Sequence, residues 1–300
     1  MIVPPPLQPG SRIQIVAPSS PFDHEEARKG IAWLSRRYEV AWDEGLFSRE
    51  GFLAGTDERR RSELARAFED PSIAAIVAAR GGYGLSRIAH ELPWGALLAS
   101  PKWIVGFSDI TALHVEAAAR CLASMHAPMV CGIGRASENE RERFVELLEH
   151  PFAERRFEGL VTIHPGEAEG LLFGGNLCLL HAAAASNRLR VPEGAIVLLE
   201  DVGERPYRVD RMLTNLIVGG HFEKVRGFAL GDFTDCAPGP DGVTVENVLR
   251  ERLERLGRPT LAGLPIGHGK RNEGVVLGAW ARLDASRGTL VVGGASGGEG

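Results

Sequence analysis

The sequence has 300 residues, of which 44% are hydrophobic and 24% charged, so it can bury one large core or two of ordinary size. Its formal net charge of −5, with basic residues scattered along the chain, argues against a nucleic-acid-binding groove. Its apolar runs are shorter than the roughly 18–20 residues of a membrane helix, and its first residues do not resemble a signal peptide, so we expect no membrane association and a cytoplasmic location.

Four short runs in the first part of the chain are typical of strands because they are apolar or rich in β-branched residues: residues 12–18, 38–43, 72–80 and 102–108. Helical patterns lie between them. Asp23 and Glu26 have the spacing of a capping box before one helix, and Thr56 is placed to cap another. Residues 110–121 indicate a helix after the last strand. Strands that alternate with helices predict a parallel sheet covered on both faces.

The pattern changes near residue 140. We expect an N-terminal α/β domain over residues 1–140, a connecting helix and loop-rich linker over 141–169, and a C-terminal domain over 170–300. Five runs in the C-terminal domain are typical of strands: residues 195–201, 227–233, 260–267, 275–285 and 288–294. The last of them follow one another closely, which predicts a partly antiparallel sheet. The Gly/Ser-rich end, residues 293–300, is typical of a flexible tail.

The four cysteines favour buried thiols over a zinc site or a disulfide framework, because none of them forms a C-x-x-C pair. They are Cys121, Cys131, Cys178 and Cys236. The cysteines therefore give no reason to expect a zinc ion, and we expect no cofactor.

Ser108 stands where an apolar strand ends and a helix begins, in the sequence GFSDI. A strand, a tight turn with glycine, a serine and a helix form the arrangement of a nucleophile elbow. The N–H group of Asp109 would lie in the first turn of the helix, where it could donate to an oxyanion. However, the second glycine of G-x-S-x-G is missing, and a helix N-cap at Ser108 or Asp109 explains the same residues. The local sequence leaves both interpretations open.

A glycine-rich loop follows the strand at residues 72–80, in the sequence ARGGYG. Such a loop permits positive φ angles and close approach of a ligand to backbone N–H groups. Gly82 is therefore a candidate for a second oxyanion donor. The loop lacks the lysine of a phosphate-binding loop, and a simple tight turn is the alternative.

Glu200 ends one predicted strand, and His268 lies in a glycine-flanked loop after another. A serine nucleophile needs a base such as histidine, and the histidine needs a carboxylate to fix its tautomer. Ser108 would supply the nucleophile, His268 the base and Glu200 the carboxylate. Along the chain they follow the order Ser, Glu, His. An ordinary loop histidine is the alternative for His268, and His126 is its one rival as a base.

Seven stretches between residues 15 and 269 together resemble the LD-carboxypeptidases, a family of serine peptidases that trim murein tetrapeptides. The stretches are IVAPSSP, FLAGTDERR, ARGGYG, GFSDITALH, LLFGGNLCLL, LEDVGERPYRVDRML and GLPIGHG. The resemblance implies an N-terminal α/β domain like that of class I glutamine amidotransferases and a C-terminal swivelling β/β/α domain. It also implies a homodimer, no metal ion and a catalytic triad of Ser108, Glu200 and His268. The implied reaction releases the terminal D-Ala from a murein tetrapeptide during cytoplasmic recycling of the cell wall.

Removal of a single terminal residue requires a group that holds the free carboxylate of the substrate. Arg80 is our candidate because a guanidinium can donate two parallel hydrogen bonds, and Gly81 beside it is a second candidate contact. An ion pair between Arg80 and a neighbouring acid is the alternative. Two other functions stay open: hydrolysis of peptidyl or aminoacyl adenylates of the microcin C type, and a non-catalytic binding protein with a doubly wound ligand cleft.

Overall fold

The structure, a computed structural model, describes residues 1–294, so residues 295–300 of the expected tail lie outside the described part. The chain divides into two compact units, Met1–Pro151 and Phe152–Gly300. The expected connecting segment 141–169 is shared between them, because its helix belongs to the first unit and its remainder to the second. Among residues 1–294, no helix is both long enough and apolar enough to span a bilayer.

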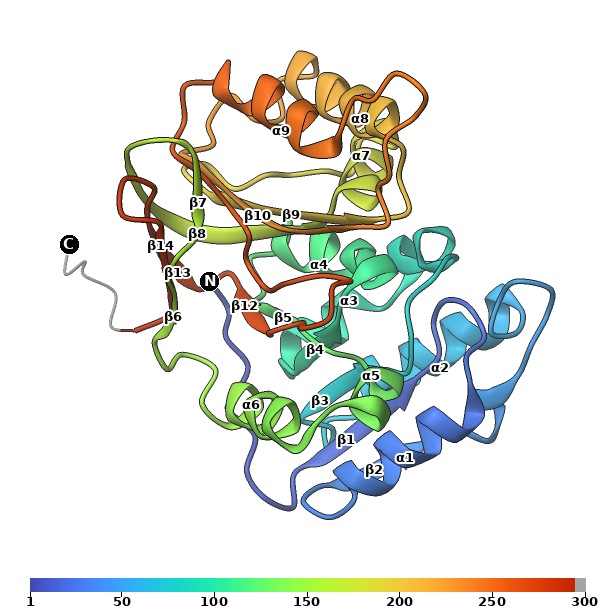
Figure 1. Cartoon of the computed structure of the whole chain (residues 1–300). Helices are drawn as coiled ribbons and strands as arrows, with labels where there is room; N and C mark the ends of the chain where they lie inside the picture. The colour runs from blue at the N-terminus through green and yellow to red at the C-terminus, as the bar shows by residue number, and fades with distance from the viewer. Residues whose placement is uncertain (295–300) are drawn as a thin grey trace. The chain divides into compact units, whose positions relative to one another are not determined.

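The first unit contains a parallel sheet whose strands follow the order β5-β4-β3-β1-β2 (Figure 1). The strands are β1 (Arg12–Val16), β2 (Glu39–Trp42), β3 (Ala75–Ala78), β4 (Trp103–Gly106) and β5 (Ser124–His126). The helices are α1 (His24–Leu34), α2 (Asp57–Glu69), α3 (Trp94–Ala99), α4 (Thr111–Ala118), α5 (Val130–Arg135) and α6 (Glu138–Glu149). The parallel sheet predicted from the alternation of strands and helices is therefore confirmed.

Two helices of this unit, α1 and α2, begin where the sequence predicted. Asp23 accepts a hydrogen bond from the N–H group of Glu26 at 2.9 Å, and Thr56 accepts one from Arg59 at 3.0 Å. One face of the sheet packs against α2, α3 and α4 in a core that includes Val16, Leu64, Phe68, Ile76, Trp94, Ile104 and Leu113. The carboxyl ends of these strands lie at one edge, where ligands of open α/β sheets bind.

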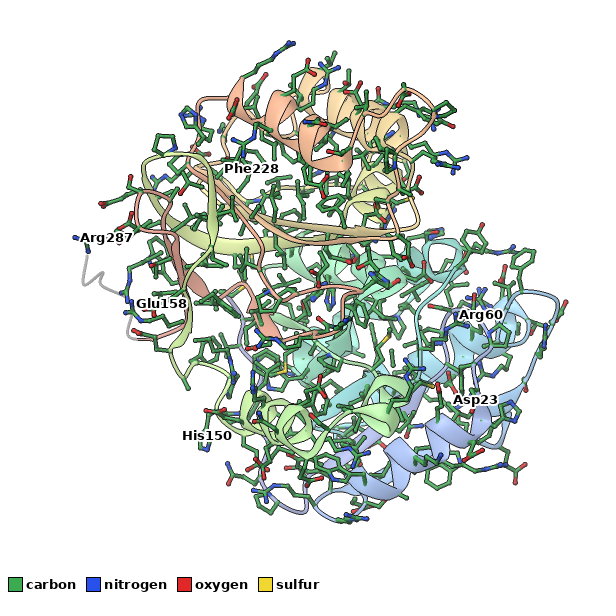
Figure 2. The ribbon with its side chains drawn as sticks, in the orientation of Figure 1. Asp23, Arg60, His150, Glu158, Phe228 and Arg287 are labelled. Atoms are coloured by element: carbon green, nitrogen blue, oxygen red, sulfur yellow. The ribbon has the colours of Figure 1, made fainter. Side chains whose placement is uncertain are left out.

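The second unit contains a mixed sheet in the order β6-β14-β13-β8-β9-β10-β11-β7. Its strands are β6 (Arg155–Phe157), β7 (Val161–His164), β8 (Glu167–Asn176), β9 (Ile196–Val202), β10 (Gly227–Thr234), β11 (Thr260–Ala262), β13 (Trp280–Asp284) and β14 (Thr289–Val292). Strands β8 to β11 are parallel, and the remaining pairs are antiparallel, as predicted. The helices α7 (Leu177–Ala185), α8 (Pro206–Val218) and α9 (Val245–Glu254) lie together on one face of this sheet (Figure 1). Phe228, labelled in Figure 2, is buried there against Phe222.

Two predicted strands of the second unit are shorter than expected. The run 260–267 ends as a strand at Ala262, because Gly263 has a φ of +88° that leaves the extended conformation. The run 275–285 is broken into β12 (Val275–Leu277) and β13 by Gly278, whose φ is +90°. The expectation that all four thiols are buried is wrong for Cys121, which is exposed, and for Cys178, which is half-buried.

Candidate active site

Ser108 lies two residues after the end of strand β4, in a short 3₁₀ turn (Ser108–Ile110) that leads into α4. Its φ of +64° is in the left-handed region, which costs a side-chain-bearing residue roughly 1–2 kcal/mol. Gly106 permits the turn, because a Cβ atom there would lie 2.8 Å from Cγ1 of Ile110. The strained turn that the sequence predicted at Ser108 is therefore present, and the serine is half-buried rather than enclosed.

The N-cap interpretation of these residues is wrong. The cap position of the 3₁₀ turn is Phe107 and that of α4 is Ile110, and neither makes a side-chain capping hydrogen bond. The carboxylate of Asp109 instead accepts a hydrogen bond from the N–H group of Leu85 at 2.9 Å. Asp109 is buried, and this burial raises the pKa of its carboxyl group. Ser108 thus does not hold its position in order to cap a helix.

The glycine-rich loop after β3 reaches the Ser108 turn. A Cβ atom on Gly81 would lie 3.0 Å from Cβ and 3.2 Å from Oγ of Ser108, and 3.4 Å from the backbone nitrogen of Asp109. Gly82 has a φ of +113°, and a Cβ atom there would lie 2.4 Å from Oγ of Ser20. Glycine is therefore required at position 82, and a side chain at position 81 would be in tight contact with Ser108.

Arg80 is exposed, and its Nη1 atom donates a hydrogen bond to the carbonyl oxygen of Pro21 at 2.7 Å. Its partner in the structure is therefore a backbone carbonyl, whereas the alternative considered above was an acidic side chain. A guanidinium carries five donors, so one hydrogen bond to a carbonyl leaves it able to bind a carboxylate.

Glu200 and His268 are in direct contact in the second unit. Glu200 is fully buried near the end of the central strand β9, and its Oε2 atom lies 2.7 Å from Nδ1 of His268. The histidine side chain is 18% exposed. Because an ionised carboxylate only accepts hydrogen bonds, the contact places the proton of a neutral imidazole on Nδ1 and leaves Nε2 as a base. The structure thus brings together two predicted residues that are 68 positions apart in the chain.

The loop that carries His268 depends on two glycines. Gly267 has a φ of +126°, and a Cβ atom there would lie 2.9 Å from Oε2 of Glu200. A Cβ atom on Gly269 would lie 2.2 Å from Oδ2 of Asp232, the carboxylate oxygen that accepts a hydrogen bond from the Gly269 N–H group at 3.2 Å. Burial raises the pKa of Asp232. The loop can therefore lie against both carboxylates only because these residues lack side chains.

Sequence reasoning missed two polar residues beside Glu200. Asn176 ends β8 in register with Glu200, and its Nδ2 atom donates to Oδ1 of Asp201 at 2.9 Å. Asp232 lies on the adjacent strand β10. Both could have been found by asking which polar residues occupy the carboxyl ends of neighbouring parallel strands. Burial raises the pKa of Asp201 to about 6.

The rival base, His126, is fully buried at β5. Its ring packs against Phe107, with 5.6 Å between the ring centroids. The neighbouring His114 is also buried, which lowers its pKa to about 3, and its ring nitrogens contact Oγ of Ser124 and the carbonyl oxygen of Gly106, both at 2.9 Å. A base that accepts and releases protons during turnover needs access to the substrate, which these two buried rings lack.

Comparisons with known proteins cover nearly all of this chain. The sequence profile of the LD-carboxypeptidase N-terminal domain matches residues 13–127, and that of the LD-carboxypeptidase C-terminal domain matches residues 169–283. The murein tetrapeptide carboxypeptidase of Pseudomonas aeruginosa is 34% identical over 255 residues, which cover 80% of this chain and 82% of that protein.

Solved structures show the same two-domain fold. The muramoyltetrapeptide carboxypeptidase of Oxalobacter formigenes is 29% identical, with a TM-score of 0.83 over 94% of this chain and 99% of that chain. The microcin C7 self-immunity protein MccF, solved in complex with aspartyl sulfamoyl adenosine, has a TM-score of 0.88 over 98% of this chain and 99% of its own. MccF is 22% identical, so the likeness concerns the fold alone. From the two profiles and the sequence identity to its relatives, this chain belongs to the LD-carboxypeptidase family.

Proposed function

We propose that this protein is a serine LD-carboxypeptidase that releases the terminal D-Ala from murein tetrapeptides, with Ser108 as its nucleophile and the Glu200–His268 pair as its acid–base system. The observation that carries the proposal is the 2.7 Å hydrogen bond between Glu200 and His268, since a buried carboxylate that orients a partly exposed imidazole is the base half of a catalytic triad. The names of the relatives from Pseudomonas aeruginosa and Oxalobacter formigenes support the substrate.

The proposed mechanism begins when Nε2 of His268 takes the proton of Ser108 while Oγ attacks the carbonyl carbon of residue three of the peptide. The negative charge moves to the carbonyl oxygen, where the N–H groups of Asp109 and Gly82 stabilise it. Glu200 stabilises the imidazolium that forms. As the tetrahedral intermediate collapses, His268 gives its proton to the leaving amine and free D-Ala departs.

Water then completes the reaction. His268 removes a proton from a water molecule, the resulting hydroxyl group adds to the acyl carbon, and the bond to Oγ of Ser108 breaks as the serine regains a proton. Arg80 supplies the group that distinguishes a carboxypeptidase from an endopeptidase, by binding the carboxylate of D-Ala before it is released.

Mass spectrometry of a murein tetrapeptide incubated with the wild type and with Ser108→Ala tests the proposal. We expect the wild type to remove one alanine and the variant to lose activity by a factor on the order of 10⁶, because triad residues act as a unit. In the same assay Arg80→Ala should lower kcat/KM. If both the wild type and Ser108→Ala cut the peptide, Ser108 is not the nucleophile.

The same assay separates the two other functions. A wild type that spares the tetrapeptide and hydrolyses an acyl sulfamoyl adenylate would assign the protein to the microcin C type of hydrolase. A wild type that cuts neither compound and resists a serine-directed acylating probe would be a binding protein.

We further infer a cytoplasmic homodimer. The four free thiols support a reducing compartment. The homodimer is what the family resemblance implies, and sedimentation velocity would measure the oligomeric state.

A further inference from the structure

The loops around Ser108 are joined by two buried charged side chains to which the proposed mechanism assigns no role. Arg60, labelled in Figure 2, is a fully buried residue of α2. It lies in the stretch FLAGTDERR, which contributes to the family resemblance without an assigned function. Asp109 is buried beside the proposed nucleophile. Buried charges are costly unless they are paired or hydrogen-bonded, so their partners indicate why they are present.

Arg60 binds two loops at once. Its Nη1 atom donates to the carbonyl oxygen of Pro18, in the loop after β1, and to that of Gly84 at 3.0 Å, at the end of the glycine-rich loop. Its Nη2 atom pairs with Asp57, one helical turn earlier on α2. The planar guanidinium suits this task because its donors point in fixed and divergent directions.

Asp109 binds the same glycine-rich loop from the other side. Its Oδ2 atom accepts the hydrogen bond from Leu85, the residue that follows Gly84. The two loops also contact each other, because the N–H group of Ser20 donates to the carbonyl oxygen of Gly81 at 3.3 Å and that of Tyr83 donates to Oγ of Ser20 at 3.0 Å. The glycine-rich loop is therefore held near Gly81, at Tyr83 and on both sides of the Gly84–Leu85 peptide bond.

The fit around Gly84 leaves little freedom. Gly84 has a φ of +123°, and a Cβ atom there would lie 2.9 Å from Nη1 of Arg60 and 2.5 Å from Cδ2 of Leu53. Removing either charged side chain would leave a buried N–H or C=O group without its partner, which destabilises that arrangement of the loop. A loop relaxed in this way would move Gly81 and Gly82 relative to the Ser108 turn.

We propose that Arg60 and Asp109 are positioning residues, which fix the glycine-rich loop against the Ser108 turn so that the N–H groups of Gly82 and Asp109 point at one oxyanion. The inference rests on the proposed function. It assigns the side chain of Asp109 a task separate from that of its backbone N–H group. Oxyanion donors accelerate a reaction only when their directions are set before the charge develops.

Steady-state kinetics with a murein tetrapeptide test the proposal through three substitutions. Asp109→Ala removes the acceptor for the Leu85 N–H group, and we expect kcat to fall about 10²-fold while KM changes less than about 3-fold. Asp109→Asn keeps an acceptor oxygen, so its kcat should lie within about 10-fold of the wild type. Arg60→Lys keeps the charge without the fork of donors, so its kcat should fall at least about 10-fold.

Lys102→Gln is the matched control for stability. Lys102 is a fully buried cation of the same unit, whose Nζ atom donates to the carbonyl oxygens of Ala67 and Phe68 at 3.1 Å, at the end of α2 away from Arg60 and Asp57. Its loss should lower the urea midpoint without changing the kcat of the folded enzyme. All variants are assayed at a temperature at which circular dichroism shows them folded.

The labelling rate of Ser108 by a fluorophosphonate provides a second readout that does not depend on the peptide, and it should fall in parallel with kcat. The proposal is overturned if folded Asp109→Ala keeps the wild-type kcat, so that any fall in its kcat/KM comes from KM alone. It is also overturned if the kcat of Lys102→Gln falls as far as that of Asp109→Ala. If Asp109→Ala does not fold, wild-type kcat and labelling in Arg60→Lys overturn it. If the wild type releases no D-Ala, the proposed function is refuted. In that case the positioning role is still tested by the fluorophosphonate, and equal labelling rates of Ser108 in the wild type and in Arg60→Lys would overturn it.

Discussion

The Ser108 turn and the Glu200–His268 pair are held in place by different kinds of interaction. Ser108 has a left-handed φ of +64° and lies against Gly81, so its position depends on the backbone and on side chains that are absent. Glu200 occupies a regular strand, and a hydrogen bond of 2.7 Å joins its carboxylate to the ring of His268. Both arrangements should therefore be sensitive to added atoms, and the second should also be sensitive to a change of charge.

Glu200→Gln gives the largest effect that this comparison predicts. The amide keeps the size of the side chain but cannot stabilise the imidazolium, and it can bind the histidine in the wrong tautomer. We expect kcat to fall about 10³–10⁴-fold with little change in KM or in the Ser108 turn. Steady-state hydrolysis of the tetrapeptide measures the loss.

Glu193→Gln is the matched control, because Glu193 belongs to the same unit and its side chain is 74% exposed beside Lys224. This variant should retain wild-type kinetics. A loss of less than about 10-fold in Glu200→Gln would show that the carboxylate does not orient the base, and the contrast between the two half-sites would then disappear.

The sequence predicted several local features of the first unit. The caps at Asp23 and Thr56 and the turn at Ser108 follow from residues that are neighbours in the chain, and the structure contains them. The strands β6 and β7 lie in the segment that we expected to be a loop-rich linker, because edge strands such as Arg155–Phe157 are partly exposed and lack a continuous apolar pattern. The helix α7 was missed because its apolar residues show little periodicity.

What the sequence could not predict is contact between distant residues. Nothing near Glu200 indicates that His268 lies 2.7 Å away, because the order of β9, β10 and β11 in the sheet decides which strand ends are neighbours. The same holds for Asp109 and Leu85, which are 24 positions apart. Asp232 and Asn176 can be recognised as polar residues near strand ends, but their contacts also depend on strand order, about which periodicity within one segment carries no information.

Gly267→Ala sharpens the comparison with an intermediate effect, because it adds an atom to the half-site that depends on charge. Its Cβ atom would lie 2.9 Å from Oε2 of Glu200 at a φ of +126°, so the carboxylate or the loop must shift. We expect kcat to fall about 10²-fold, since a displacement on the order of 1 Å at reacting groups costs that much.

Gly263→Ala provides the control for backbone strain, because it also has a positive φ, +88°, but its Cβ atom would have nothing within 4 Å. Both variants should lose stability, and Gly267→Ala alone should lose activity when each is assayed in its folded state. Equal kcat values in the two variants would mean that the loop around His268 tolerates displacement. The rate would then not depend on the close contact between Gly267 and Glu200.

The smallest expected effect concerns stability at Ser108. Ser108→Gly and Ser108→Ala both lack the hydroxyl group and differ only in the Cβ atom. A left-handed φ costs alanine about 1–2 kcal/mol, whereas glycine loses about 0.5–1 kcal/mol through its freer unfolded chain. The glycine variant should therefore be more stable by about 0.5–1 kcal/mol in urea denaturation. At Ser35, where φ is −66°, the same pair should show the opposite order. If alanine equals or exceeds glycine in stability at both positions, the turn carries no strain, and Ser108 is held by its contacts with Gly81 rather than by the backbone conformation.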